Sequence, residues 1–162
     1  MSEGWEQSQE FRSVMGRFPT GVTVVAAVRE TGTPFGLTVN SFTSVSLDPP
    51  LVLVCVNRGA ASHDGLLAAP SFCVSVLAEE QVALASRFAS DPSETRFDDV
   101  AWEPCPQGAP RVLGAVAWLE CTRHEAYTVG DHTIMVGRVA SLGEGEGASL
   151  VFHRGTFGSA GT

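Results

Sequence analysis

Apolar and polar residues follow one another along this chain in short runs, and most of these runs predict β-strands. Residues 22–28 are apolar and largely β-branched, and residues 31–34 hold the Gly and Pro of a turn that closes a hairpin onto the next strand. Residues 40–47 alternate between polar and apolar, which predicts a half-buried strand. Phe42 and Val45 are its expected packing residues, with a bulge between them.

Longer or more apolar runs predict further strands. Residues 51–56 and 72–77 are apolar on both faces, as the central strands of a barrel or sandwich are. Two long strand patterns follow at residues 115–127 and 132–142, and a glycine-containing turn joins them. A last short strand is predicted within residues 150–157.

Three helices are predicted. An amphipathic helix lies near the start of the chain, where four apolar residues recur at helical spacing, and it ends before Pro19. These four residues are Phe11, Val14, Met15 and Phe18. Residues 62–68 and 79–89 predict two short connecting helices, and Ser62 is a favourable N-cap for the first.

The order of these elements predicts the fold class. Many short strands, few helices and no alternation of strand and helix favour a mainly β fold, an antiparallel barrel with a few peripheral helices. A chain of 162 residues is long enough for one domain with its own core. We expect one domain over residues 1–162, with its core at about 10–157 and a flexible tail at 158–162.

The charge pattern bears on the partners of the chain. Its formal net charge is −8, and all ten basic residues are arginines that stand singly. Non-specific nucleic-acid affinity comes from neutralising phosphates with clustered Lys and Arg, so we expect no nucleic-acid partner. Single arginines suit local tasks, such as binding one phosphate group.

Residues 1–9 carry two glutamates and lack the basic start and apolar stretch of a secretory signal. No apolar segment is long enough to span a bilayer, so we expect a cytoplasmic protein without a membrane partner. The four cysteines are far apart in the sequence and form no C-x-x-C pair, which favours buried free thiols. The histidines show no ligand spacing either, so we expect no metal site.

The common catalytic motifs are absent from the sequence. It contains no H-E-x-x-H, P-loop, G-x-G-x-x-G or G-x-S-x-G motif. Ser62, His63 and Asp64 are adjacent, so their side chains should diverge and not form a relay.

Several polar residues remain, and the residues alone leave two interpretations of each open. Thr38, Ser41 and Ser44 fit the ordinary polar face of a half-exposed strand as well as a binding site. Arg87 fits a solvated helix residue, and His132, in Gly-Asp-His, fits a turn residue.

Three sequence segments carry a resemblance to a known family. They are FRSVMGRFPTGVTVVAA at residues 11–27, GLTVNSFTSVSLDPPLVLVCVN at 36–57 and GDHTIMVGRV at 130–139. In this order and spacing they resemble the flavin reductase family, whose fold is the FMN-binding split barrel. The resemblance extends from Phe11 to Phe157.

The resemblance implies a position for the flavin ring. A flat ring with one polar edge needs backbone groups and short polar side chains in an otherwise apolar cleft. The residues implied to border it are Thr38, Val39, Asn40, Ser41, Phe42, Ser44 and Val45 on one side, and Cys55, Val56 and Asn57 on the other.

The resemblance also implies where the charged groups bind. Ala61 and Ser62 at a helix N-terminus, with Arg87 and Phe88 from the next helix, should hold the flavin phosphate. His132 should lie near both the flavin and the nicotinamide, and the segment Arg154, Gly155 and Thr156 should help to seat the dinucleotide.

As a member of this family the chain would transfer hydride from NADH or NADPH to FMN or FAD. It would supply the reduced flavin to a separate flavin-dependent monooxygenase, and it would act as a homodimer with site walls from both subunits. Two alternatives stay open at this point: a flavoprotein of the same fold that keeps FMN permanently bound, and a non-catalytic carrier of flavin or another small ligand.

Overall fold

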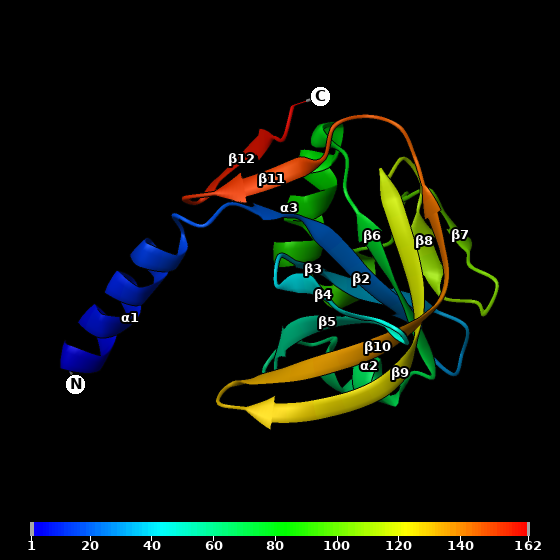
Figure 1. Ribbon diagram of the computed structural model, residues 1–162, viewed down its shortest axis with the longest axis horizontal. Coiled ribbons are helices and arrows are strands. Elements are labelled where there is room, and N and C mark those ends of the chain that lie inside the picture. Colours follow the sequence, from blue (N-terminus) through cyan, green and yellow to red (C-terminus); the bar gives the residue numbers. More distant parts are fainter. Residues whose placement is uncertain (1, 162) are drawn as a thin grey trace.

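The computed structural model describes residues 2–161 and is dominated by one twisted seven-stranded antiparallel sheet (Figure 1). Its strand order is β3-β2-β6-β9-β10-β5-β4. The bounds are β2 Thr23–Val28, β3 Pro34–Val39, β4 Phe42–Leu47, β5 Pro50–Asn57, β6 Ser71–Val76, β9 Ala117–Val129 and β10 His132–Glu144. This confirms the mainly β, antiparallel prediction. The two edge strands β3 and β4 do not pair, so the sheet curves without closing, as in a split barrel.

Two smaller sheets complete the β-structure. β1 (Thr20–Gly21), β11 (Leu150–His153) and β12 (Thr156–Ser159) form one, and β7 (Trp102–Pro104) and β8 (Pro110–Val112) form the other. β12 takes in the first two residues of the segment that was expected to be a flexible tail.

Residues 2–161 form five helical segments outside the sheets. They are α1 (Ser2–Met15), α2 (His63–Ala68), the 3₁₀ turn η1 (Glu79–Gln81), α3 (Val82–Ser90) and the 3₁₀ turn η2 (Ser93–Thr95). α1, α2 and the η1–α3 unit match the three predicted helices. In residues 2–161 no helix is both long and apolar enough to cross a bilayer.

The core has two parts because β2 is buried on both of its faces. One cluster fills the inside of the curved sheet and includes Val54, Phe72 and Met135, with Leu66 of α2 packed against them. The other lies between β2, α3 and β11 and includes Val24, Phe88 and Leu150.

The β7–β8 hairpin is fastened to the large sheet by a buried carboxylate. Glu120 of β9 is fully buried, and its two oxygens accept hydrogen bonds from the backbone amides of Gln107 and Ala109 and from the hydroxyl of Ser141. Ser75 of β6 accepts a further bond from the amide of Val112. We call these groups the buried polar cluster.

α1 does not pack on the body of the chain. Figure 1 shows it extending away from the sheets, and its expected packing face is open: Phe11 is 65% exposed and Phe18 is 69% exposed. The predicted helix is therefore confirmed, but its apolar face has no partner within the described residues of this chain. Its end is held by a hydrogen bond from the Arg154 amide to the Gly16 carbonyl.

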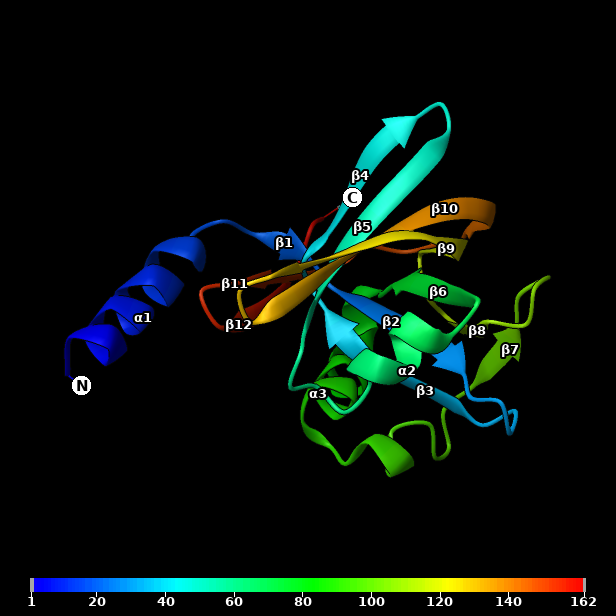
Figure 2. The ribbon, with the colours of Figure 1, turned by 90° about the horizontal axis from the view of Figure 1, so that it is seen from below.

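One packing prediction was wrong. Phe42 packs against the inner core cluster, whereas Val45 is 50% exposed. The register of β4 against β5 shifts between Ser44 and Ser46, so the bulge falls at Val45 and turns its side chain outward. The β4–β5 hairpin also extends beyond the rest of the sheet, as Figure 2 shows, so that little is available to cover its tip.

Candidate functional site

The polar residues of β4, β5 and β10 come together at one side of the sheet. Ser41 joins the start of β4 to β5: its hydroxyl donates to the Cys55 carbonyl over 2.8 Å and accepts from the Cys55 amide over 3.1 Å. Asn57 ends β5, and its side-chain oxygen accepts the Gly59 amide over 2.7 Å, which shapes the loop towards α2. We call the surface formed by Ser41, Cys55, Asn57 and His132 the polar edge; Ser44 pairs with the buried Val52 and so belongs to the other face of the sheet.

His132 belongs to this surface because it pairs directly with Asn57 across β10 and β5. Directly opposed residues of antiparallel strands share a face, and this face is opposite to that of the buried Val56. The imidazole is 43% exposed, and its Nδ1 lies 2.7 Å from the carboxylate of Asp131. That hydrogen bond and the charge of His132 hold the pKa of Asp131 below its ordinary value.

A second histidine supports the same strand from the inside. His63 of α2 is buried; its Nε2 lies 2.8 Å from the Thr133 hydroxyl and its Nδ1 lies 2.7 Å from the carboxylate of Asp64. The expectation that the adjacent side chains of Ser62, His63 and Asp64 diverge is wrong for His63 and Asp64, which are hydrogen-bonded, whereas the Ser62 hydroxyl bonds elsewhere. The chain Asp64–His63–Thr133 ties α2 to β10 next to His132.

Thr38 and Asn40 lie where β3 leads into the polar edge. The Thr38 hydroxyl donates to the Ala85 carbonyl of α3 over 2.6 Å, so this side chain fixes the helix against the strand. Asn40 is exposed and lies in the short link to β4, next to Ser41. The side chain of Val39 points into the core, as does that of Val56, so these two residues offer only backbone groups to a ligand.

Around the start of α2 the structure brings together different residues from those expected. The Ser62 side chain is fully buried, and its hydroxyl donates to the Gly36 carbonyl over 3.1 Å. The guanidinium of Arg96 donates to the same carbonyl over 2.9 Å and also to the Asp91 carbonyl. Partial burial lowers the pKa of Arg96 from its ordinary value. Ala61, next to Ser62, is exposed.

Arg87 and Phe88 face other parts of the molecule. Arg87 donates to the carbonyl of Asp98 and lines a cavity of about 310 Å³ beside that segment. Phe88 is fully buried and meets Phe97 edge to face, with ring centroids 4.9 Å apart. The Phe88 side chain is thus a core element, which corrects the expectation that it borders the flavin phosphate.

The segment expected to seat the dinucleotide forms the turn between β11 and β12. Arg154 and Gly155 both have positive φ, as a tight two-residue hairpin turn requires, and Thr156 pairs with His153. Arg154, Gly155 and Thr156 are exposed. Figure 1 shows this turn well apart from the β9–β10 turn that carries His132, so a single chain does not bring the two together.

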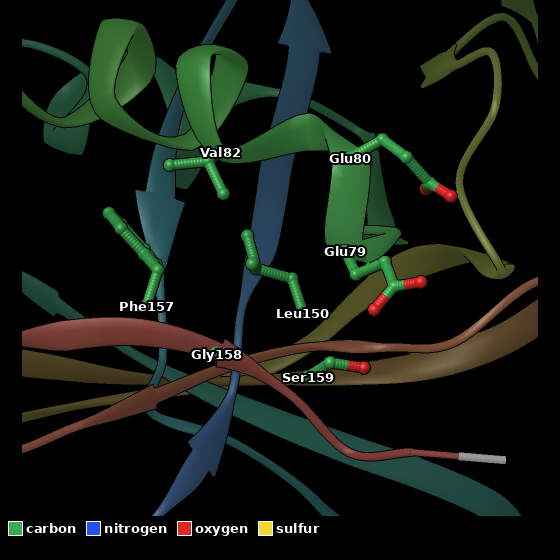
Figure 3. Close-up of a pocket in the computed structure, with 7 residues that line it drawn as sticks. All are labelled: Glu79, Glu80, Val82, Leu150, Phe157, Gly158 and Ser159. Atoms are coloured by element: carbon green, nitrogen blue, oxygen red, sulfur yellow. The ribbon is translucent and has the colours of Figure 1, made fainter.

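A cavity of about 370 Å³ lies elsewhere, between η1, the start of α3 and β12. Figure 3 shows Val82, Leu150 and Phe157 at its centre, with the Glu79 carboxylate and Ser159 at its rim. The carboxylates of Glu79 and Glu80 would repel a phosphate group, so this cavity does not suit a flavin nucleotide.

Comparison with known proteins then decides the family. The flavin reductase like domain family matches residues 15–161 of the chain. This chain belongs to that family.

Individual relatives agree with this assignment. An NADH-dependent FMN reductase of Agrobacterium fabrum is 44% identical over 155 residues, which cover 96% of this chain and 87% of that protein. The NADH:FAD oxidoreductase of Streptomyces globisporus, solved with NAD and FAD fragments, superimposes with a TM-score of 0.87 at 44% identity, over 94% of this chain and 92% of that chain. The flavin reductase component of a bacterial two-component tryptophan halogenase superimposes with a TM-score of 0.88 at 44% identity. The match covers 96% of this chain and 99% of that chain.

Sequence reasoning missed two features of this flavin reductase like domain. Arg96 stands in a polar loop with no motif around it, so nothing marked it above the other isolated arginines. The contact of His63 with Thr133 joins residues 70 positions apart, which no local pattern reveals.

Proposed function

We propose that this chain is an NAD(P)H:flavin oxidoreductase that reduces FMN or FAD and supplies the reduced flavin to a separate flavin-dependent monooxygenase. Three relatives support this proposal: one is an NADH-dependent FMN reductase, one an NADH:FAD oxidoreductase, and one the flavin reductase component of a two-component halogenase. The observation that carries it is the polar edge itself. Ser41, Asn57 and His132 meet on adjoining strands although they are far apart in the sequence.

The polar edge suits the polar side of a planar ring. Asn40, directly before Ser41, is exposed beside it, and the backbone groups of residues 39–42 and 55–57 belong to the same strand ends. Val45 of β4 is half exposed and offers apolar surface on the same hairpin. This combination of apolar walls with a few convergent polar groups is typical of cofactor sites.

For the phosphate we propose the exposed Ala61 and the adjoining backbone of the buried Ser62, together with Arg96. The Ser62 hydroxyl is already used by Gly36, so any contribution of Ser62 would come from its backbone. Arg96 approaches the same carbonyl and carries the positive charge that a phosphate requires. Arg87, which donates to Asp98, is outside this proposed set.

We propose a homodimer as the active form. Apolar side chains on one face of α1 and at the end of the β9–β10 hairpin are exposed, including Phe11, Met15, Tyr127 and Val129. A second copy would cover such surfaces, which monomeric proteins rarely leave open. It would also supply the Arg154–Thr156 turn near His132, which one chain keeps apart.

The nicotinamide and the flavin themselves supply the hydride chemistry, so the protein needs no nucleophile. Its residues bind and orient the two rings and exclude water from between them. His132 is placed to donate or accept one hydrogen bond at the polar edge, and Asp131 fixes its orientation through Nδ1. We further propose that residues 1–162 form one domain. We also propose that the protein acts in the cytoplasm, because the reaction needs a supply of NADH.

A single assay separates this proposal from its alternatives. Purified protein is mixed with NADH or NADPH and with catalytic or excess FMN or FAD, and the absorbance of the reduced nicotinamide is followed. Many turnovers per protein are expected for a reductase. One stoichiometric bleaching would indicate a flavoprotein with permanently bound FMN, and no change with either flavin would indicate a carrier and contradict the proposal.

A further inference from the structure

Two cysteines that are 32 positions apart in the sequence meet where the β7–β8 hairpin packs on the large sheet. The sulfurs of Cys73 on β6 and Cys105 at the end of β7 lie 3.7 Å apart and share a hydrogen bond. Both are free thiols, and both are buried. Cys121 is also a buried free thiol but has no such partner among the described residues, and Cys55 lies at the polar edge.

The surroundings of this pair hold the sulfurs in place. Cys73 sits in the middle of β6, where it pairs with Ala26 of β2 and with Glu120 of β9. Cys105 begins the tip of the β7–β8 hairpin, whose amides at Gln107 and Ala109 are bound by the Glu120 carboxylate. The two thiols therefore face each other across a contact that the buried polar cluster already fixes.

The two thiols differ in acidity. The hydrogen bond between the two sulfurs lowers the pKa of Cys105, and the same bond together with burial raises the pKa of Cys73. A thiolate is the reactive form of cysteine, so Cys105 is the sulfur that reacts first with an oxidant.

We propose that Cys73 and Cys105 are a redox modification site at which hydrogen peroxide forms a disulfide that staples the β7–β8 hairpin to β6. The Cys105 thiolate attacks one peroxide oxygen, the O–O bond breaks, and the released hydroxide takes up a proton to become water. The Cys73 sulfur then attacks the sulfenic sulfur of Cys105, and the departing hydroxide leaves with the Cys73 proton as a second water. Two thiols are oxidised and one peroxide is reduced.

The source of hydrogen peroxide rests on the proposed function. Reduced flavin that meets oxygen before it meets a monooxygenase yields oxidised flavin and hydrogen peroxide. Access to Cys105 runs through the hairpin tip, because the adjacent Pro106 and Gln107 are exposed. A local opening of these few residues is sufficient for a molecule as small as peroxide.

The disulfide would connect two ends of a long segment. The segment between Cys73 and Cys105 contains α3 and Arg96, so the bond limits how far this part of the unfolded chain can spread. The oxidised protein should therefore melt several degrees above the reduced protein.

The full-length chain provides a direct test. Reduced, folded protein is exposed to a tenfold excess of hydrogen peroxide, unfolded in N-ethylmaleimide and analysed by intact mass and by arginine-specific peptide mapping without reduction. All four cysteines fall in different peptides, since arginines separate them. We expect two of the four thiols to be lost and the peptides 59–87 and 97–111 to be joined, while Cys55 and Cys121 stay alkylated.

Cys105→Ser is the matched control, and we expect it to keep three alkylated thiols after the same treatment. Four alkylated thiols in the treated wild type, a different pairing, or sulfinic acid at Cys105 with Cys73 unlinked would each overturn the inference. A second arm replaces added peroxide by NADH and flavin in air, with and without catalase. If added peroxide joins the two cysteines but NADH is not consumed, the proposed function fails and the modification site stands.

Discussion

The buried polar cluster and the polar edge use similar side chains in opposite ways. In the buried polar cluster, Glu120 and Ser75 are covered, and their oxygens meet amides of the β7–β8 hairpin. At the polar edge, Asn57 is exposed and the imidazole of His132 is only partly covered, and the adjoining Asn40 is exposed too. Both regions belong to the same seven-stranded sheet.

The difference teaches how to separate structural from functional polarity in this chain. A buried polar group costs stability unless it has a partner, so a fully paired set such as that around Glu120 serves the fold. Exposed short polar groups beside apolar surface keep their hydrogen-bonding capacity for a ligand. Substitutions in the first region should change stability, and substitutions in the second should change kinetics.

The largest effect is expected for Phe88→Ala. Removing this buried ring leaves a cavity next to Phe97, and such truncations cost about 3–5 kcal/mol of unfolding free energy. Urea denaturation measures the loss. Phe88→Leu, which keeps most of the volume, should lose much less; an unchanged stability with a raised KM for flavin would instead put Phe88 in the phosphate site.

Glu120→Ala should come next. It leaves the buried amide of Ala109, and that of Gln107, without this acceptor, which we expect to cost about 2–4 kcal/mol. Glu120→Gln keeps one acceptor oxygen, so its free energy of unfolding should lie between those of Glu120→Ala and the wild type. Comparable melting temperatures for all three proteins would show that the carboxylate does not fasten the hairpin.

Arg96→Ala should act on kinetics. We expect KM for flavin to rise roughly tenfold with a smaller change in kcat, because a phosphate contact contributes similarly to the ground state and the transition state. Steady-state assays at saturating NADH measure this. Arg87→Ala is the control, since its guanidinium donates to Asp98; a larger rise in KM for this control than for Arg96→Ala would reverse the assignment.

His132→Ala should affect kcat or nicotinamide binding more than KM for flavin. We expect kcat or the affinity for the nicotinamide to fall several-fold, while KM for flavin and the melting temperature change little, because the side chain is partly exposed and hydrogen-bonds to the exposed Asp131. Wild-type values for both kinetic constants would remove His132 from the site.

The smallest effect concerns the titration of Asp131. Its pKa is depressed, so the interaction with His132 is present above the ordinary carboxyl range and is lost as the pH falls through the lowered pKa. NMR titration of the carboxyl carbon should show its pKa rising in His132→Ala. An unaltered titration would mean that the two side chains do not interact in solution.

Local patterns were sufficient for most of the fold and for part of the site. The apolar run before Cys55 and the alternation around Phe42 placed β4 and β5, because strand periodicity depends on neighbouring residues alone. The same patterns missed the outward turn of Val45, since a bulge is decided by the register of the partner strand. They also assigned Ser62 as a cap, whereas its hydroxyl bonds to Gly36, 26 positions away.

The proposed phosphate site was the least predictable from the sequence. Arg87 and Arg96 look alike in sequence, and only the path of the chain after α3 directs Arg96 to the Gly36 carbonyl and Arg87 to that of Asp98. The resemblance to flavin reductases supplied the family and the ring-binding segments, but it did not distinguish these two guanidinium groups.

The contact between His63 and Thr133 has a consequence for strand alignment. A slip of β10 by one residue would turn Thr133 outward and His132 inward, since successive side chains alternate between faces. That slip would leave the buried His63 ring without its hydroxyl partner, so the misaligned sheet would be less stable. The contact between α2 and Thr133 therefore disfavours the strand register in which His132 would be buried.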